Sequence, residues 1–226
     1  MIPKNKILPI VGLPRSGTSL MMQTLKHLEV PIAGQKFLKD SKEKWNPLGF
    51  YEVPYVVFDG VRELGEYGGK AIKLISQALV RTRKDIIWKS ILCLRCPFEI
   101  RQSNAKIGEG RDVSAHTYIM FLSRILEIML SQPAEKWLVV DFEDMLYEPE
   151  KEVSRIAEFL GVPVQESAIQ NVNKSMHLSL GDCYFDDSDE IIETALDLYK
   201  TLHNPWEAPS SMIEKLLSWT KAEVCC

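Results

Sequence analysis

Short apolar runs alternate with longer amphipathic ones along this chain, a pattern typical of an α/β protein. Four of the apolar runs predict strands, at Ile7–Val11, Ala71–Ile75, Ser90–Leu94 and Trp137–Val140. A strand that is apolar at nearly every position is buried on both faces, as strands are in a parallel sheet covered by helices. We therefore expect a three-layer α/β/α fold with a central, mostly parallel sheet.

Helical periodicity fills most of the sequence between and after these strands. The predicted helices are Thr18–Leu28, Glu52–Leu64, Pro97–Lys106, Val113–Leu130, Glu148–Leu160 and Ser210–Lys221. The chain beyond Gly161 is mostly helical, apart from a polar loop at Asn171–Asp189. Neither an internal repeat nor a linker rich in Gly, Pro or Ser divides the sequence. We expect a single domain over residues 1–226 with a helical C-terminal part.

The sequence from Gly12 to Ser19, Gly-Leu-Pro-Arg-Ser-Gly-Thr-Ser, connects the first predicted strand to the first predicted helix. This is the context of a phosphate-binding loop (P-loop), in which backbone N–H groups and the helix N-terminus bind an anion. The spacing of the two glycines matches a Walker A motif, but Thr18 stands where Walker A has a lysine, and Arg15 supplies the cation. Because kinases use that lysine on the transferred phosphate, the change argues against a P-loop kinase.

The core of this loop, Pro14–Ser19, resembles the 5′-phosphosulfate-binding loop of sulfotransferases that use 3′-phosphoadenosine 5′-phosphosulfate (PAPS). A second segment also resembles the family: Arg95 and Ser103 follow the third predicted strand at the family's spacing, with Cys96 replacing its Asp. A third match runs from Val139 to Gly161 and is similar to the family's strand followed by a helix ending in Phe-Leu-Gly.

The resemblance implies transfer of a sulfuryl group from PAPS, as cosubstrate and without a metal, to a hydroxyl of a small-molecule, sugar or lipid acceptor. It also implies which residues bind PAPS: Arg15, Ser16, Gly17, Thr18 and Ser19 in the loop, and Arg95 and Ser103 at the 3′-phosphate. An arginine at the carboxyl end of a parallel strand independently suits a phosphate in the same crevice. The alternative reading of Arg95 is a surface arginine paired with Glu99.

The proton acceptor for the hydroxyl is the main departure from the family. Cytosolic sulfotransferases carry a histidine base in a Lys-Thr-His run; Lys73 matches the lysine, but Ile75 stands at the histidine position. Glu52, which follows two aromatic residues, is the candidate base, and its alternative reading is an ordinary acid in the first turn of a helix. The expected catalytic residues are thus Glu52, Lys73 and Arg15.

Composition limits the partners. Lys and Arg number 27 against 31 Asp and Glu, giving a net charge of −4, and proteins that bind nucleic-acid backbones usually have the opposite balance. No stretch approaches the roughly 20 apolar residues of a membrane-spanning helix. The five cysteines form no disulfide framework, so we expect a cytoplasmic protein. Two rival functions remain, a P-loop kinase and a nucleotide- or phosphate-binding protein without transferase activity.

Overall fold

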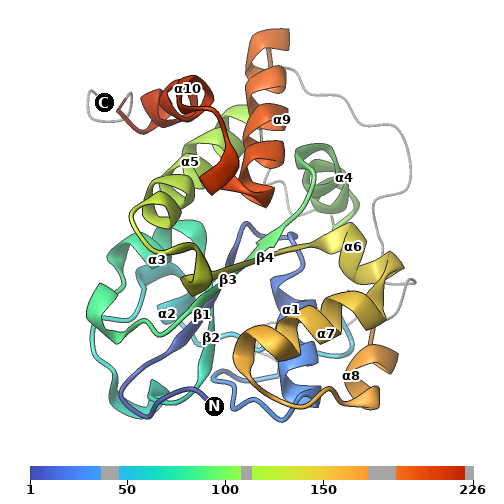
Figure 1. The fold of residues 1–226 in the computed structure, drawn as a ribbon. Coiled ribbons are helices and arrows are strands. Elements are labelled where there is room, and N and C mark those ends of the chain that lie inside the picture. The colour runs from blue at the N-terminus through green and yellow to red at the C-terminus, as the bar shows by residue number, and fades with distance from the viewer. Residues whose placement is uncertain (37–45, 108–113, 173–186, 222–226) are drawn as a thin grey trace.

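The described residues of the computed structural model, 1–36, 46–107, 114–172 and 187–221, contain one four-stranded sheet (Figure 1). Its strands are β1 (Leu8–Gly12), β2 (Ala71–Ile75), β3 (Ser90–Leu94) and β4 (Trp137–Asp141), in the order β2-β1-β3-β4. All three neighbouring pairs are parallel. The four predicted strands and the parallel sheet are therefore confirmed.

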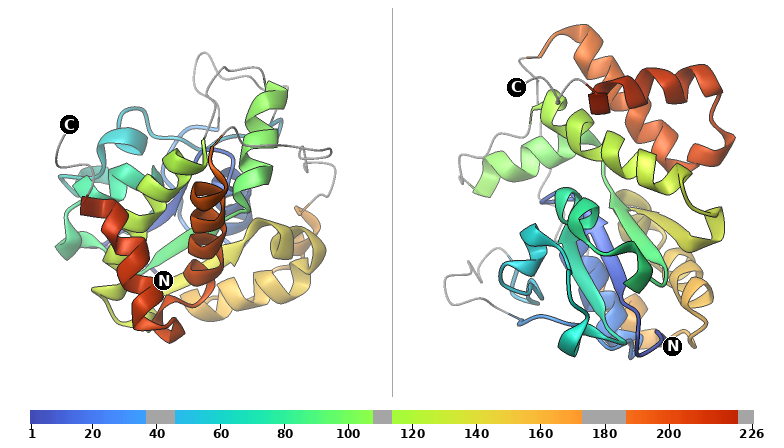
Figure 2. Two further views of the ribbon diagram at one scale, coloured as in Figure 1. Left: turned by 90° about the horizontal axis from the view of Figure 1, so that it is seen from above. Right: turned by 90° about the vertical axis from the view of Figure 1, so that its left-hand side faces the viewer.

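Helices cover both faces of this sheet, which confirms the three-layer α/β/α fold and the helical C-terminal part (Figures 1 and 2). The α-helices in the described ranges are α1 (Thr18–His27), α2 (Val56–Asp59), α3 (Ser76–Arg81), α4 (Pro97–Ile107), α5 (Ala115–Leu130), α6 (Phe142–Tyr147), α7 (Pro149–Leu160), α8 (Glu166–Gln170), α9 (Asp189–His203) and α10 (Ser210–Lys221). Short 3₁₀ turns lie at Gly65–Tyr67, Lys84–Ile86, Ala134–Lys136 and Pro205–Glu207.

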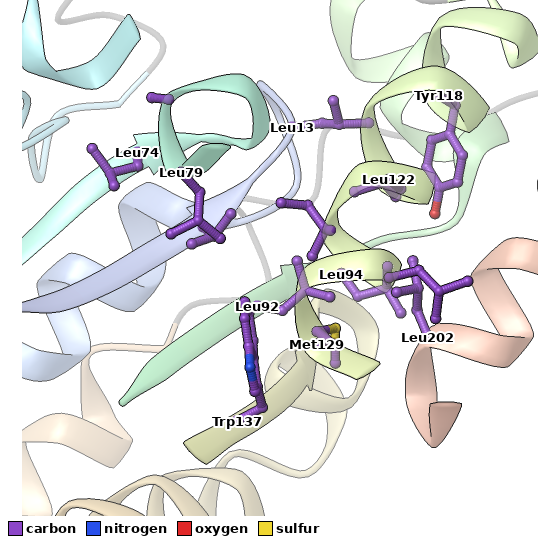
Figure 3. Close-up of a cluster of buried hydrophobic side chains, with 14 of the residues drawn as sticks. Leu13, Leu74, Leu79, Leu92, Leu94, Tyr118, Leu122, Met129, Trp137 and Leu202 are labelled. Carbon is purple, nitrogen blue, oxygen red and sulfur yellow. The ribbon is translucent and has the colours of Figure 1, made fainter. Parts of the chain in front are cut away.

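Alternate side chains of each strand enter two separate cores, because successive residues of a strand point to opposite faces. On β3, Ile91 and Cys93 pack with α1, α6 and α7, whereas Leu92 and Leu94 pack with α3, α5 and α9. Figure 3 shows the second core, where labelled side chains of the sheet and of the covering helices meet. With a core on each face, the sheet is a rigid base for the loops at the ends of its strands.

The helix expected at Glu52–Leu64 is wrong for most of its length. Only α2 is helical there, and Glu52 lies in extended backbone, bridged to Gln35. Pro54 cannot donate the hydrogen bond that would continue a helix through it, and Gly60, at φ 76°, ends α2. The polar loop expected at Asn171–Asp189 lies mostly outside the described residues. Cys225 and Cys226 also lie outside them.

Candidate active site

The carboxyl ends of the four parallel strands lie along one edge of the sheet and bring the candidate residues together. In the strand register, Gly12 at the end of β1 is level with Ile75 at the end of β2, and Leu94 of β3 is level with Asp141 of β4. The loop to α1, the strand with Lys73, the start of α4 and the start of α6 therefore share this edge. Ligands of open α/β proteins bind in this position.

The loop from β1 to α1 has the geometry of an anion-binding loop. The amide of Ser16 donates to the carbonyl of Leu13 at 3.1 Å, which closes a tight turn. Gly17, at φ 96°, precedes the first residue of α1 and has no side chain to cap the helix, so the N–H groups of the first turn have no side-chain cap and can bind an anion. The Ser16 hydroxyl is buried and makes no hydrogen bond to the described residues. A buried hydroxyl without a partner is costly, and an oxygen of a bound anion would supply one.

Lys73 connects this loop to the candidate base. Its Nζ lies 3.0 Å from the Ser19 hydroxyl oxygen on α1 and 2.7 Å from Oε1 of Glu52. The Lys73 side chain is 9% exposed and that of Glu52 is 26% exposed, so the carboxylate is the more accessible of the two. Burial lowers the pKa of Lys73, and Glu52 offsets part of that effect. The structure thus brings Glu52, Lys73 and Ser19 into one hydrogen-bonded chain, and the reading of Glu52 as a first-turn helix acid is wrong.

A buried amide network, which the sequence analysis missed, holds the turn before Glu52 against α1. The Gln23 amide donates to Asn46 Oδ1 at 3.0 Å and to the carbonyl of Gly49 at 2.8 Å, and Asn46 donates to that same carbonyl at 2.8 Å. The signal available in the sequence was Gln23 itself, a polar residue on the apolar side of a predicted helix. Because α1 also begins at the anion-binding loop, this network fixes Glu52 relative to that loop.

Two arginines connect the segment from Arg95 to Ser103 with the anion-binding loop. Arg15 Nε donates to the Ser103 hydroxyl on α4 at 3.0 Å. Arg95 donates from Nη1 to the carbonyl of Arg15 at 3.0 Å and from Nε to Glu99 at 2.8 Å. The guanidinium group of Arg95 lies 4.0 Å from the centre of the Phe142 ring, and Arg95 is only 3% exposed. The predicted pair with Glu99 exists, but its arginine is buried and not on the surface.

Comparisons with known proteins find similarity to sulfotransferases. A family model described as sulfotransferase domain matches residues 111–185. The sulfotransferase domain of the Synechococcus PCC 7002 olefin synthase is 15% identical with a TM-score of 0.50, and the match covers 100% of this chain and 97% of that one. The chain has the sulfotransferase fold. The resemblance seen in the sequence is confirmed.

Two further sulfotransferase structures share the fold. Mouse sulfotransferase SULT7A1, complexed with PAP, is 12% identical with a TM-score of 0.50, over 98% of this chain and 91% of that one. Sulfotransferase STF9 from Mycobacterium avium is 12% identical with a TM-score of 0.54, over 89% and 78%. No curated protein sequence matches the chain.

A group of acidic residues that the sequence did not reveal borders the anion-binding loop on its β4 side. Asp141 caps α6 by accepting from the amide of Glu143 at 2.8 Å, and it accepts from the Tyr199 hydroxyl at 2.7 Å. A side-chain hydrogen bond with Glu99, together with partial burial, raises the pKa of Glu143 to about 7. Burial also raises the pKa of Asp141. Glu143 therefore binds a proton more readily than an ordinary glutamate, because its carboxyl group meets that of Glu99 beside Arg95.

Within the described ranges, no three side chains of His, Cys, Asp or Glu are placed to hold a metal ion. None of the helices in those ranges is both long enough and apolar enough to cross a membrane.

Proposed function

We propose that this chain transfers a sulfuryl group from PAPS to a hydroxyl group of a small-molecule, sugar or lipid acceptor. The observation that carries the proposal is the chain of contacts from the anion-binding loop through Ser19 and Lys73 to Glu52. It supplies an anion site, a cation beside that site and a carboxylate beside the cation, on a sulfotransferase fold. Mouse sulfotransferase SULT7A1, which has this fold, is complexed with PAP (adenosine 3′,5′-bisphosphate), the nucleotide that remains when PAPS has given up its sulfuryl group.

In this proposal the loop holds the donor, through the backbone and side chains of Ser16, Gly17, Thr18 and Ser19. The Ser16 hydroxyl is buried and has no hydrogen-bond partner among the described residues, so it fits an oxygen of the phosphosulfate. Lys73 neutralises the negative charge that develops on the transferred group and on the departing phosphate oxygen, as positioned cations do in phosphoryl transfer.

Glu52 takes the proton of the acceptor hydroxyl as that oxygen attacks the sulfur atom. The new bond joins the acceptor oxygen to sulfur, the bond between sulfur and the bridging phosphate oxygen breaks, and PAP leaves. The sequence also suggested Arg15 for this step. Because its side chain bonds to Ser103 on α4, we assign Arg15 to donor binding.

The setting of this reaction is also part of the proposal. We treat residues 1–226 as one domain and place it in the cytoplasm, in keeping with the free thiols of Cys93 and Cys96. The sulfuryl group carries less charge than a γ-phosphate, and Lys73 and the loop neutralise that charge, so the proposed scheme uses no metal.

A thermal-shift experiment tests the proposal. A ligand that binds only the folded chain raises its melting temperature by mass action. We expect PAP to do so without Mg²⁺, and ATP with Mg²⁺ to do so weakly. Greater stabilisation by ATP with Mg²⁺ would refute the proposal in favour of a kinase. Stabilisation by PAP without turnover of PAPS on a panel of hydroxyl acceptors would refute the transferase and leave a nucleotide-binding protein.

A further inference from the structure

The end of β4 links the two faces of the sheet through two consecutive residues. The Phe142 ring packs in the core with α1, the helix that follows the anion-binding loop. The Asp141 carboxylate accepts from the Tyr199 hydroxyl of α9 at 2.7 Å. α9 packs in the other core, where Leu202 lies in one cluster with Leu94 of β3 (Figure 3). A contact made on the α9 face is therefore one residue away from the face that carries α1.

Tyr199 is held in a fixed orientation beside Asp141. Its ring meets the His203 ring edge-on, with 4.8 Å between the ring centres and an angle of 83° between the planes. His203 Nε2 also lies 3.4 Å from the Asp141 oxygen that accepts from Tyr199. Asp141 is only 5% exposed, and a buried carboxylate needs partners to be stable. Burial raises the pKa of Asp141, and the hydrogen bond from Tyr199 opposes that shift.

The second oxygen of Asp141 fixes the start of α6. Oδ1 accepts from the amide of Glu143 at 2.8 Å, the kind of bond by which a cap residue orients the first turn of a helix. Phe142 is the first residue of that turn. Its ring lies where a Cβ atom on Gly17 would meet it at 2.7 Å, and 4.0 Å from the guanidinium group of Arg95. The turn capped by Asp141 thus carries the ring that borders the anion-binding loop.

These contacts form a path from α9 to the loop. We infer that Tyr199 is a positioning residue for the donor: its hydrogen bond to Asp141 fixes the start of α6 and so holds the Phe142 ring against the loop. Without the Tyr199 hydroxyl, the carboxylate loses a support on the α9 side, and the turn that it caps loses it too. The inference rests on the proposed function, which makes the donor nucleotide the ligand of the loop. It gives the C-terminal helical part a role in binding that donor.

Calorimetric titration of the full chain with PAP compares two variants of α9. Tyr199→Phe loses only the hydroxyl that reaches Asp141, and we expect PAP binding to weaken by about 2–30-fold, the range for residues that act through a packed network. Thr194→Val is the matched control, because Thr194 is 1% exposed and donates its hydroxyl to the Glu190 carbonyl of the same helix at 2.8 Å. It should lower the melting temperature and leave PAP affinity unchanged.

Turnover separates positioning of the donor from an effect on folding. We expect the KM for PAPS to rise in Tyr199→Phe at an unchanged kcat, because Glu52 and Lys73 are untouched. A lower kcat at an unchanged KM, or a loss of PAP affinity no larger than in Thr194→Val, overturns the inference. In a Phe142→Leu background, Tyr199→Phe should have little further effect on PAP affinity. An equal loss in both backgrounds overturns the path through Phe142.

His203→Leu is a second variant, which decides if Tyr199→Phe does not fold. His203 is 38% exposed, and its replacement removes the ring that holds the Tyr199 ring in place. PAP binding should weaken by at least about twofold, the low end of the same range, and an unchanged affinity overturns the inference. A wild-type chain that does not bind PAP refutes the proposed function itself, whereas loss of binding confined to the Tyr199 and His203 variants supports both.

Discussion

Replacing Glu52 by Gln is the sharpest test of the proposed chemistry. The amide keeps the size of the side chain and can still accept from Lys73, whose Nζ lies 2.7 Å from Oε1, but it cannot take a proton. Loss of a general base typically costs about 10²–10⁴-fold in rate, or about 2.7–5.4 kcal/mol of barrier. Turnover of PAPS should fall on this scale, while PAP affinity stays within a few-fold of wild type, because the loop is untouched.

The same substitution has a smaller effect on folding, which sets the conditions of the assay. It leaves the Lys73 ammonium buried beside a neutral partner, and hydrogen bonds to charged groups contribute about 1.5–3 kcal/mol. Because Glu52 is 26% exposed, we expect the low end of that range. For a chain of this size, 1 kcal/mol shifts the melting temperature by about 2–4 °C. The rates should therefore be compared well below the melting temperature of the variant.

Single-turnover rates with a saturating acceptor, together with PAP titration, separate the two effects. Glu127→Gln is a matched control, because Glu127 also pairs with a cation, Arg124, but lies on α5 and is exposed. Turnover of Glu52→Gln within about threefold of this control would refute Glu52 as the base. A loss of PAP affinity as large as the loss of rate would show that Glu52 acts through the shape of the loop.

Two further variants test the packing and the protonation around the loop. Gly17→Ala places a methyl group 2.7 Å from the Phe142 ring at φ 96°, whereas in Gly161→Ala the methyl group meets nothing within 4 Å at φ 66°. Both variants carry about 1–2 kcal/mol of backbone strain, so we expect Gly17→Ala to have the lower melting temperature. Equal melting temperatures would contradict the contact with Phe142. Glu99 raises the pKa of Glu143 from 4.5 to about 7, so the native chain holds a proton that the unfolded chain releases, and stability should fall as pH rises from about 4.5 to 7. Denaturant titrations across this window should show a shallower fall in Glu143→Gln than in the wild type. An unchanged slope would exclude Glu143 as the source of the pH dependence.

The strands were predictable from the sequence because each is a continuous apolar run, buried on both faces of a parallel sheet. The observed strand ends lie within one residue of the predicted ones, and Asp141 is added to β4. The segment after Glu52 was not predictable from its apolar spacing. Pro54 and Gly60 restrict helix to Val56–Asp59 between them, and this local chemistry overrides the periodicity.

The candidate site was predictable only where a motif is continuous in sequence. The loop from Gly12 to Ser19 needs only the strand before it and the helix after it, so it could be recognised without knowledge of any long-range contact. The burial of Arg95 depends on Glu99, on Phe142 and on Tyr118, which come from three different helices. No spacing along the chain encodes that convergence, and for this reason the sequence could suggest Arg95 and its pair with Glu99, but not the contacts with Phe142 and Tyr118 that bury the pair.

The anion-binding loop interleaves positions that serve folding with positions that serve recognition. Any side chain at Gly12 would lie 2.3 Å from the Ser16 hydroxyl and 2.8 Å from a backbone oxygen of β3, and Ser16 itself is buried. Pro14, Arg15 and Ser19 retain contact with solvent. A library randomised at 14, 15 and 19 would therefore vary ligand preference among chains that still fold, whereas any side chain at 12, or one larger than serine at the buried position 16, would yield mostly misfolded protein. Within eight residues, selection for a new donor can act on one set of positions and leave the other unchanged.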